Sequence, residues 1–310
     1  MHSHHSHSGD YISHATGSLE DMVAAAKRRG FSHFCLTEHM PRLSDKYLYP
    51  EEIDKNYTKR DLAADFDKYF AHARKIQERE NSEGTIKLLV GFEVEGIDRA
   101  HVEAAGQFLG QSDMCVGSVH HVNEIPIDFN AELWLQARHS VGGTSHDLYR
   151  EYFQLQYRVL SALKPAVVGH FDLIRLFDPR DAENGNADFS LQSDWPEVWA
   201  LVERNIKCAV EYGGLFEINS SAVRKSWDTP YPQRDIAEAI KSHGGRFCLS
   251  DDSHSCEQVG LNFHKLWDYV VNTLNLDKIY HLDLLDDSSV GVVAENVTDL
   301  SQLSFWEQYK

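Results

Sequence analysis

The sequence has no apolar run long enough to cross a bilayer, which takes about 18 or more residues, and its first residues lack the apolar core of a secretory signal. Cysteine is also scarce: the five thiols form no Cys-x-x-Cys pair and make an odd number, which is typical of a reducing compartment and not of a disulfide framework. We therefore expect a cytoplasmic protein with no membrane partner, in which the thiols pack in the core. They are Cys35, Cys115, Cys208, Cys248 and Cys256.

Positive charge is in short supply as well. Thirty Lys and Arg stand against 48 Asp and Glu, which gives a formal net charge of −18 at pH 7. Contacts to a nucleic-acid backbone require clustered Lys and Arg, so the composition argues against a nucleic-acid partner. Bound cations would offset part of the negative charge. The hydrophobic content of 42% in 310 residues is enough for a sizeable core, in one large α/β barrel or two smaller domains.

Histidine, in contrast, is abundant. Most of the 18 histidines lie where hydrophobic runs end, and the chain opens with Met-His-Ser-His-His-Ser-His-Ser. An expression tag is normally an unbroken His run, whereas this one is interrupted by Ser and continues into Gly9 and Asp10. Imidazole and carboxylate groups together are the ligands of Zn, Mn and Fe, so the pattern predicts a site with several metal ions.

Short apolar runs alternate with amphipathic helices, the pattern of βα units. One helix is predicted to start at Ser18 as N-cap and to end at Gly30. Residues with metal-binding side chains follow the apolar runs: Glu38 and His39 after 31–37, Glu93 and Glu95 after 87–92, His120 after 114–119, His170 after 166–169, Asn219 after 215–218, and Asp251 and Asp252 after 247–250. In an α/β barrel the C-terminal ends of all strands meet on one face, so we expect these side chains to converge there.

Six motifs in this order resemble the polymerase and histidinol phosphatase (PHP) superfamily: His5-Ser6-His7-Ser8, Thr37-Glu38-His39, Gly91-Phe92-Glu93, Gly117-Ser118-Val119-His120, Gly169-His170-Phe171-Asp172 and Asp252-Ser253-His254. Within the superfamily, the last three of these motifs, the segment 219–224 and the Gly260 that follows Asp252-Ser253-His254 resemble the histidinol-phosphate phosphatases. The resemblance implies a distorted TIM-like (β/α)7 barrel over 1–310. It also implies three divalent metal ions, Zn, Fe or Mn, at the C-terminal face of the strands.

The resemblance further implies a ligand set, carried over motif by motif. A first ion takes His5, His7 and Asp252; Glu93 bridges it to a second ion held by His120 and His170; and a third takes His39, His254 and His14. Alternatives stay open for several positions. His2 and His4 share the spacing of His5 and His7, and Asp10 competes with His14.

Other residues near these motifs have two possible roles. Glu38 is either a ligand or a carboxylate that orients a metal-bound imidazole, and Glu95 and Asp251 have the same ambiguity. His121 either binds metal or lines the substrate pocket. The remaining histidines are expected to be solvated or to pack in the core: His33, His72, His101, His139, His146, His243, His264 and His281.

The predicted reaction is the hydrolysis of a phosphate monoester by attack of metal-bound hydroxide, since no P-loop sequence is present and no Ser or Cys nucleophile is required. Arg224, Arg175 and Arg42 are candidates for binding the phosphate, because a guanidinium binds two oxygens at once. Beside Glu93, the catalytic candidates are Asp252 and His254, either of which, like a metal-bound water, could protonate the leaving alkoxide.

The resemblance implies L-histidinol phosphate as the substrate, a small molecule whose ammonium and imidazole suit an acidic pocket. Tyr11, Phe171 and Trp134 are candidates for packing on the imidazole. Residues from about 127 to 150 form either a lid or an insertion on the rim, and 181–194 a polar loop.

Three competing functions remain. The first is a PHP-type nuclease or phosphodiesterase, the second is another small-molecule phosphoesterase or an amidohydrolase, and the third is a metal-stabilised scaffold. The acidic charge argues against the first. The carboxylate-rich ligand set argues against the third, because structural zinc sites prefer closed sets of Cys and His.

Overall fold

Seven parallel strands form one sheet in the order β1-β2-β3-β4-β7-β8-β9 in the computed structural model, which describes residues 1–179, 189–285 and 289–310. The strands are His2–Ser3 (β1), His33–Leu36 (β2), Lys87–Glu93 (β3), Met114–Gly117 (β4), Val167–Val168 (β7), Leu215–Asn219 (β8) and Arg246–Ser250 (β9). The sheet curves until its edges meet, where the His4 N–H donates to the Leu249 carbonyl at 3.1 Å. The predicted seven-stranded α/β barrel is therefore confirmed.

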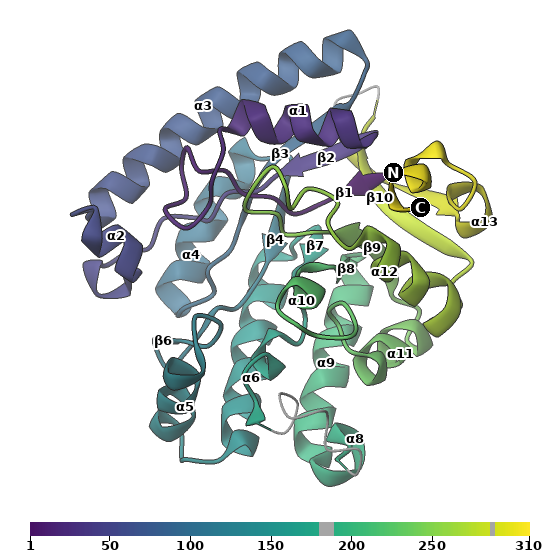
Figure 1. Cartoon of the computed structure of the whole chain (residues 1–310). Coiled ribbons are helices and arrows are strands. Elements are labelled where there is room, and N and C mark those ends of the chain that lie inside the picture. The colour runs from purple at the N-terminus through teal and green to yellow at the C-terminus, as the bar shows by residue number, and fades with distance from the viewer. Residues whose placement is uncertain (180–188, 286–288) are drawn as a thin grey trace.

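Helices cover the outside of this barrel (Figure 1). They are Leu19–Arg29 (α1), Pro50–Asp54 (α2), Lys59–Glu83 (α3), Arg99–Phe108 (α4), Ala131–Ser140 (α5), Ser145–Leu163 (α6), Leu191–Asp194 (α8), Pro196–Tyr212 (α9), Ser221–Arg224 (α10), Arg234–Ser242 (α11), Phe263–Asp268 (α12) and Val297–Leu300 (α13). Helix α1 has the predicted ends: the Ser18 hydroxyl accepts from the Asp21 N–H, and Gly30 adopts the left-handed conformation at φ 81°. Of the polar stretch 181–194, residues 181–188 lie outside the described residues, and the rest includes α8 instead of being all loop.

Two hairpins complete the fold. His121–Val122 (β5) pairs with Ile125–Pro126 (β6), and Lys278–Leu284 (β10) pairs with Val290–Asn296 (β11), both antiparallel. The β10–β11 hairpin was not predicted from the sequence. It packs at the N-terminal ends of the barrel strands, and both chain ends lie beside it (Figure 1). Leu282 of β10 joins the interior cluster, and its backbone N–H donates to His4 Nε2 at 3.1 Å.

The barrel interior is filled by apolar side chains that include Cys35 and Cys248, and Cys115 lies in the apolar layer between the strands and the helices. Cys35, Cys115 and Cys248 are buried as predicted, whereas Cys208 and Cys256 are half-buried; all five are described and are free thiols. Within the described ranges, no helix has the length and apolar character that a membrane span requires. Because these apolar side chains fill the interior toward the N-terminal ends of the strands, the C-terminal ends can carry polar side chains.

Candidate metal centre and active site

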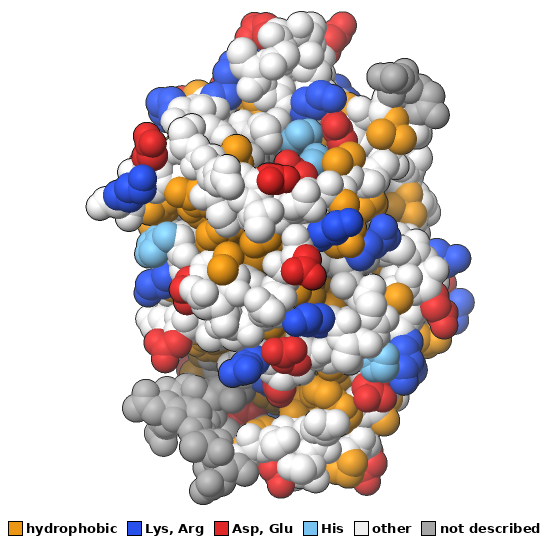
Figure 2. All heavy atoms as spheres, turned by 90° about the vertical axis from the view of Figure 1, so that its right-hand side faces the viewer, with side chains coloured by type: hydrophobic (Ala, Val, Ile, Leu, Met, Phe, Trp, Pro, Cys, Tyr) orange, Lys and Arg blue, Asp and Glu red, His pale blue; other side chains and the backbone are white. Residues whose placement is uncertain are grey.

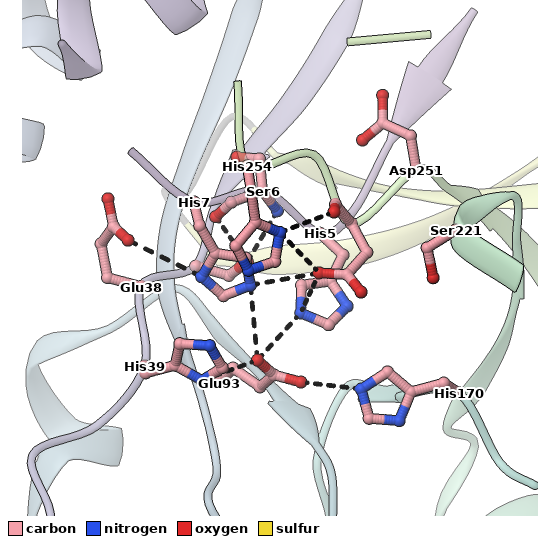
Figure 3. Close-up of polar contacts among 12 residues, drawn as sticks. His5, Ser6, His7, Glu38, His39, Glu93, His170, Ser221, Asp251 and His254 are labelled. Atoms are coloured by element: carbon pink, nitrogen blue, oxygen red, sulfur yellow. Dashed lines mark hydrogen bonds and ion pairs between the residues drawn. The ribbon is translucent and has the colours of Figure 1, made fainter. Parts of the chain in front are cut away.

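The carboxylate of Glu93, the last residue of β3, lies at the centre of five histidines at the C-terminal ends of the strands. Figure 3 shows it beside His5, His7, His39 and His170. Its Oε2 lies 3.2 Å from His5 Nε2, 3.4 Å from His7 Nε2 and 3.0 Å from His39 Nδ1. The other oxygen, Oε1, lies 3.2 Å from His120 Nε2 and 3.0 Å from His170 Nε2. Each oxygen thus faces a different group of imidazoles, which is the position a bridging carboxylate requires.

Asp252, which follows β9, contacts the first of these groups. Its Oδ1 lies 3.3 Å from His7 Nε2, 3.7 Å from His5 Nε2 and 3.6 Å from His254 Nδ1. Asp252 also has a φ of 48°, a left-handed conformation that costs energy in residues other than Gly and that often marks a functional site. Burial alone would raise the pKa of Asp252, but the imidazoles of His5, His7 and His254 hold this pKa well below its usual value.

His14 lies beside His39 and His254, the two histidines with which it was predicted to bind a third ion. Its ring stacks on His254 at a centroid distance of 5.0 Å and lies 5.5 Å from the ring of His39. Its competitor Asp10 is used elsewhere, because its carboxylate accepts from the Leu19 N–H at the start of α1, at 2.8 Å. The structure therefore favours His14 over Asp10 as a ligand.

The donor set fits divalent metal ions. Among the described residues, several buried atoms of the site have no hydrogen-bond partner: His5 Nε2, both ring nitrogens of His7, His39 Nδ1 and His120 Nδ1. Burial raises the pKa of Glu93, yet the neighbouring imidazoles of His5, His120 and His39 lower it far more, so the carboxylate is charged. Charged carboxylates, and imidazoles that give up their proton when they bind an ion, are the ligands that Zn, Fe and Mn take.

Two further carboxylates hold the histidines in place from behind. Glu38 accepts hydrogen bonds from the Ser8 N–H at 2.9 Å and the Ser8 hydroxyl at 2.6 Å, and its second oxygen lies 3.7 Å from His7 Nδ1. Glu95 lies 3.4 Å from His120 Nδ1. Both carboxylates face the Nδ1 atom of an imidazole whose Nε2 faces Glu93. This arrangement favours an orienting role over direct ligation.

Glu217, the third residue of β8, also belongs to the site and was not predicted from the sequence. This fully buried carboxylate lies 3.2 Å from His5 Nδ1, and it accepts from the His170 backbone N–H at 2.6 Å and from the Asn219 amide at 2.8 Å. Burial raises the pKa of Glu217, but His5 lowers it below its usual value. The sequence feature that could have identified Glu217 is its position inside the apolar run Leu-Phe-Glu-Ile-Asn. Burial of an unpaired carboxylate is costly, so an acidic residue in a buried strand is expected to have a partner.

A cavity of about 280 Å³ opens above the candidate metal ligands. Its lining residues are His14, His39, Tyr49, Glu93, His120, Asp128, Phe129, His170, Arg224, Lys225, Asp252, His254 and Gln258. Among them, Asp128, Lys225, Tyr49 and Phe129 were not predicted as site residues. The rings of Tyr49 and Phe129 stack at 6.0 Å with 12° between their planes. Lys225 directly follows Arg224 in the sequence, and this basic pair could have indicated that Lys225 also lines the site.

Of the three arginines predicted to bind phosphate, the structure places one at the cavity. Arg224 lines it, and its guanidinium donates to the carbonyls of Asp251 at 3.1 Å and Asp252 at 2.9 Å. Arg42 is buried away from the cavity, where it pairs with Glu52 and, at 2.8 Å, with Glu95. Arg175 pairs with Asp235 at 2.7 Å and is also buried away from it. Carboxylates from other parts of the chain hold these two side chains, which is why they do not point to the site.

Other candidates are placed away from the cavity too. His121 is buried in β5 with its ring 6.0 Å from that of Tyr49, and burial lowers its pKa to about 3. Trp134 is buried in α5 and donates to the Ile174 carbonyl at 2.8 Å, so it packs in the core and not on a substrate. Phe171 is likewise a core residue, and the Tyr11 hydroxyl bonds to His72 at 2.9 Å. Asp251 bonds to the Ser3 hydroxyl at 3.0 Å and the Gly260 N–H at 2.6 Å, on the side away from Glu93.

Imidazoles and carboxylates that converge on the floor of a cavity, at the C-terminal ends of barrel strands, define the class of metal-dependent hydrolases. Residues 3–221 match the PHP domain, and the chain belongs to this family. It is 41% identical to the histidinol-phosphatase of Saccharomyces cerevisiae, over 91% of this chain and 92% of that protein. It is 43% identical to the probable histidinol-phosphatase of Schizosaccharomyces pombe, over 96% of this chain and 94% of that protein.

Two solved structures have the same fold. A putative histidinol phosphatase from Listeria monocytogenes superposes with a TM-score of 0.69 at 21% identity, over 85% of this chain and 99% of that one. The histidinol phosphate phosphatase of Lactococcus lactis, solved with Zn, L-histidinol and phosphate, superposes with a TM-score of 0.66 at 18% identity, over 94% of this chain and 98% of that one. These neighbours confirm the TIM-like barrel.

Proposed function

We propose that this protein hydrolyses L-histidinol phosphate to L-histidinol and phosphate, a step of histidine biosynthesis, with divalent metal ions bound around Glu93. The observation that carries the proposal is the position of the Glu93 carboxylate, within 3.4 Å of five imidazoles. It occurs in a chain that is 41–43% identical to two proteins named as histidinol-phosphatases. The alternative of a nuclease is not favoured, because the relatives and the acidic composition both point to a small substrate.

The proposed ligands are the nine residues of the predicted set, in three groups around three ions: His5, His7 and Asp252; His120 and His170, with Glu93 shared; and His39, His254 and His14. Support comes from two triads, His5-His7-Glu93 and His7-His39-His254, whose potential ligand atoms lie within 4.8 Å of one another. Glu217, Glu38 and Glu95 hold the imidazoles from behind. Zn fits this set, as do Fe and Mn.

When bound, such ions neutralise the phosphoryl oxygens and lower the pKa of water from about 15.7 toward about 7, so that it attacks phosphorus near neutral pH. The protein's own groups complete the pocket. Arg224 and Lys225 line it with positive charge for the phosphate, and Asp128 lines it with negative charge for the ammonium or imidazole. The stacked rings of Tyr49 and Phe129 provide an apolar wall for the imidazole. Asp252 and His254 lie beside one another on the cavity wall, and the pKa of each is held well below its usual value, so we assign the proton for the leaving alkoxide to water at the site.

The segment 127–150 borders the cavity through Asp128 and Phe129, which supports its role as a cover over the substrate. We propose this role, together with a cytoplasmic location and a single PHP barrel domain over 1–310. Phe129→Ala tests the cover, because Phe129 is the apolar side chain through which this segment borders the cavity. Raised KM for the substrate with unchanged metal content is the expected result, and an unchanged KM would contradict it.

Phosphate release tests the proposed function directly. We expect the purified protein, loaded with Zn or Mn, to release phosphate from L-histidinol phosphate much faster than it hydrolyses bis(p-nitrophenyl) phosphate or a single-stranded oligonucleotide. Faster hydrolysis of the oligonucleotide would favour the nuclease. Rapid release from unrelated monoesters, with no preference for L-histidinol phosphate, would favour a general phosphoesterase.

Asp128→Asn is expected to raise KM for L-histidinol phosphate about 10-fold, since a hydrogen bond to a charged group is worth about 1.5–3 kcal/mol. The phosphate ester of p-nitrophenol has no ammonium, so its kcat/KM should change little. Steady-state kinetics with both esters measure the difference. Equal losses for the two substrates would show that Asp128 does not bind the amine.

Glu217→Gln keeps the shape of the side chain but removes the charge that faces His5. We expect about a 10-fold loss of metal affinity and of kcat/KM, the usual effect of removing a carboxylate that orients a metal-bound imidazole. Metal titration and kinetics measure both quantities. Glu211→Gln, on the exposed surface of α9, is the matched control, and equal behaviour of the two variants would contradict the assigned role.

A further inference from the structure

A second group of histidines lies at the other end of the barrel from Glu93, where the β10–β11 hairpin packs on the first residues of β1 and β2. His2 and His33 begin these two strands and are paired in register. On the hairpin, Ile279, His281 and Asp283 are two residues apart along β10, so their side chains lie on the same face. Glu295 of β11 is paired with Ile279, so its side chain lies on that face as well. We call His2, His33, His281, Asp283 and Glu295 the basal cluster.

The basal cluster contains two triads that share His281. In the first, Glu295 Oε2 lies 3.0 Å from His281 Nδ1 and 3.6 Å from His2 Nε2. In the second, Asp283 Oδ1 lies 3.5 Å from His33 Nε2, and the rings of His33 and His281 are 4.3 Å apart. The potential ligand atoms of each triad lie within 4.8 Å of one another. Two imidazoles and one carboxylate are a common ligand set for zinc.

His2 shows that the cluster is more than a set of surface ion pairs. The side chain is fully buried, and neither ring nitrogen has a hydrogen-bond partner in the part of the chain that the structure describes. Burial, together with the nearby His4 and His281, lowers the pKa of His2 well below its usual value, so the ring is neutral and has a free lone pair. A buried imidazole without a partner is costly, and a bound cation would remove that cost.

The neighbouring His4 is different, because both of its nitrogens are used within the fold. Nδ1 bonds to the Leu249 carbonyl at 3.0 Å, and Nε2 accepts from the Leu282 N–H at 3.1 Å. His4 therefore attaches the hairpin to β9 by hydrogen bonds alone. His2, two residues before His4, has no such bonds among the described residues and lies beside His281 and Glu295.

The two triads are not equally available. Asp283 is already paired with Lys87, whose Nζ lies 3.2 Å from its Oδ1, so its charge is compensated. Glu295 has no Lys or Arg partner among the described residues, and its side chain is 35% exposed, which leaves a route for an ion to the buried His2. On the molecular face that carries the hairpin, histidine side chains reach the surface beside acidic ones (Figure 2).

We propose that the basal cluster binds one divalent transition-metal ion, of which zinc is the best match, through His2, His281 and Glu295. The ion would join β1 to both strands of the hairpin and so hold the hairpin against the base of the barrel. This site is separate from the ions proposed around Glu93 and does not depend on the hydrolytic function.

The zinc content of four proteins tests the proposal: the wild type, His281→Gln, Glu295→Gln and the control His139→Gln, which removes an exposed histidine on α5. Each is stripped with a chelator, reloaded with zinc and freed of excess ion by gel filtration. We expect the wild type and the control to hold the same amount of zinc per chain and the two cluster variants to hold one ion less. Hydrolysis by the two variants, measured at room temperature, should be unchanged.

Equal zinc content in all four proteins would overturn the proposal. If His281→Gln does not fold, Glu295→Gln, which changes a partly exposed side chain, gives the decisive comparison. Anomalous diffraction at the zinc edge from wild-type crystals gives a second, independent reading. A peak between His2 and His281 supports the site, and peaks confined to the surroundings of Glu93 refute it.

Discussion

Glu93→Gln is expected to lower kcat for L-histidinol phosphate by about 10³-fold or more and to reduce the metal content of the protein. The neutral amide cannot bridge two cations, and the loss of about 4 kcal/mol of charge stabilisation in the transition state corresponds to this factor. The geometry makes the effect large, because both oxygens of one carboxylate serve five imidazoles. Metal analysis and single-turnover kinetics on the same sample measure the two losses together.

Glu80→Gln is the matched control for this prediction. Glu80 is also a buried glutamate, but it lies on α3, where it pairs with Lys27 at 2.5 Å, far in the structure from the cavity lining. Its replacement should affect stability and leave metal content and kcat nearly unchanged. Full metal content and full turnover in Glu93→Gln would show that Glu93 is not the bridging residue.

Most residues of the candidate metal centre could be expected to lie close together because they follow the strands. In a parallel barrel the C-terminal ends of strands converge. His39 and His170 therefore both contact Glu93, although they lie 54 residues before it and 77 residues after it in the chain. The apolar runs that end in these residues were visible in the sequence. The alternation of strands and helices likewise predicted the barrel.

The residues that were missed or misplaced depend on tertiary contacts that no local pattern records. Glu217 lies within a strand, and its role follows from its closeness to His5 across the barrel, 212 residues away. Arg175 was predicted at the phosphate, but Asp235, 60 residues further along, holds it elsewhere. His33 and His281 were expected to be solvated or packing residues, and the unpredicted β10–β11 hairpin brings them together beside carboxylates.

Arg224→Ala is the second large effect that we expect, with KM for L-histidinol phosphate raised about 100-fold. Arg224 lines the cavity beside Lys225, and the loss of charge-assisted hydrogen bonds to a phosphate costs about 3 kcal/mol, which corresponds to this factor. Steady-state kinetics measure KM, and metal analysis of the same sample shows whether the metal centre is intact. Arg158→Ala, on α6 and away from the cavity lining, is the control.

The contacts of Arg224 make metal content the decisive measurement. Its guanidinium also donates to the backbone carbonyls of Asp251 and Asp252, so it supports the segment that carries a proposed ligand. A raised KM with full metal content indicates that Arg224 binds the phosphate. Loss of metal together with kcat would mean instead that Arg224 acts by positioning Asp252, and Arg224→Lys separates the two: a lysine keeps the positive charge for the phosphate but cannot reproduce both hydrogen bonds of the planar guanidinium.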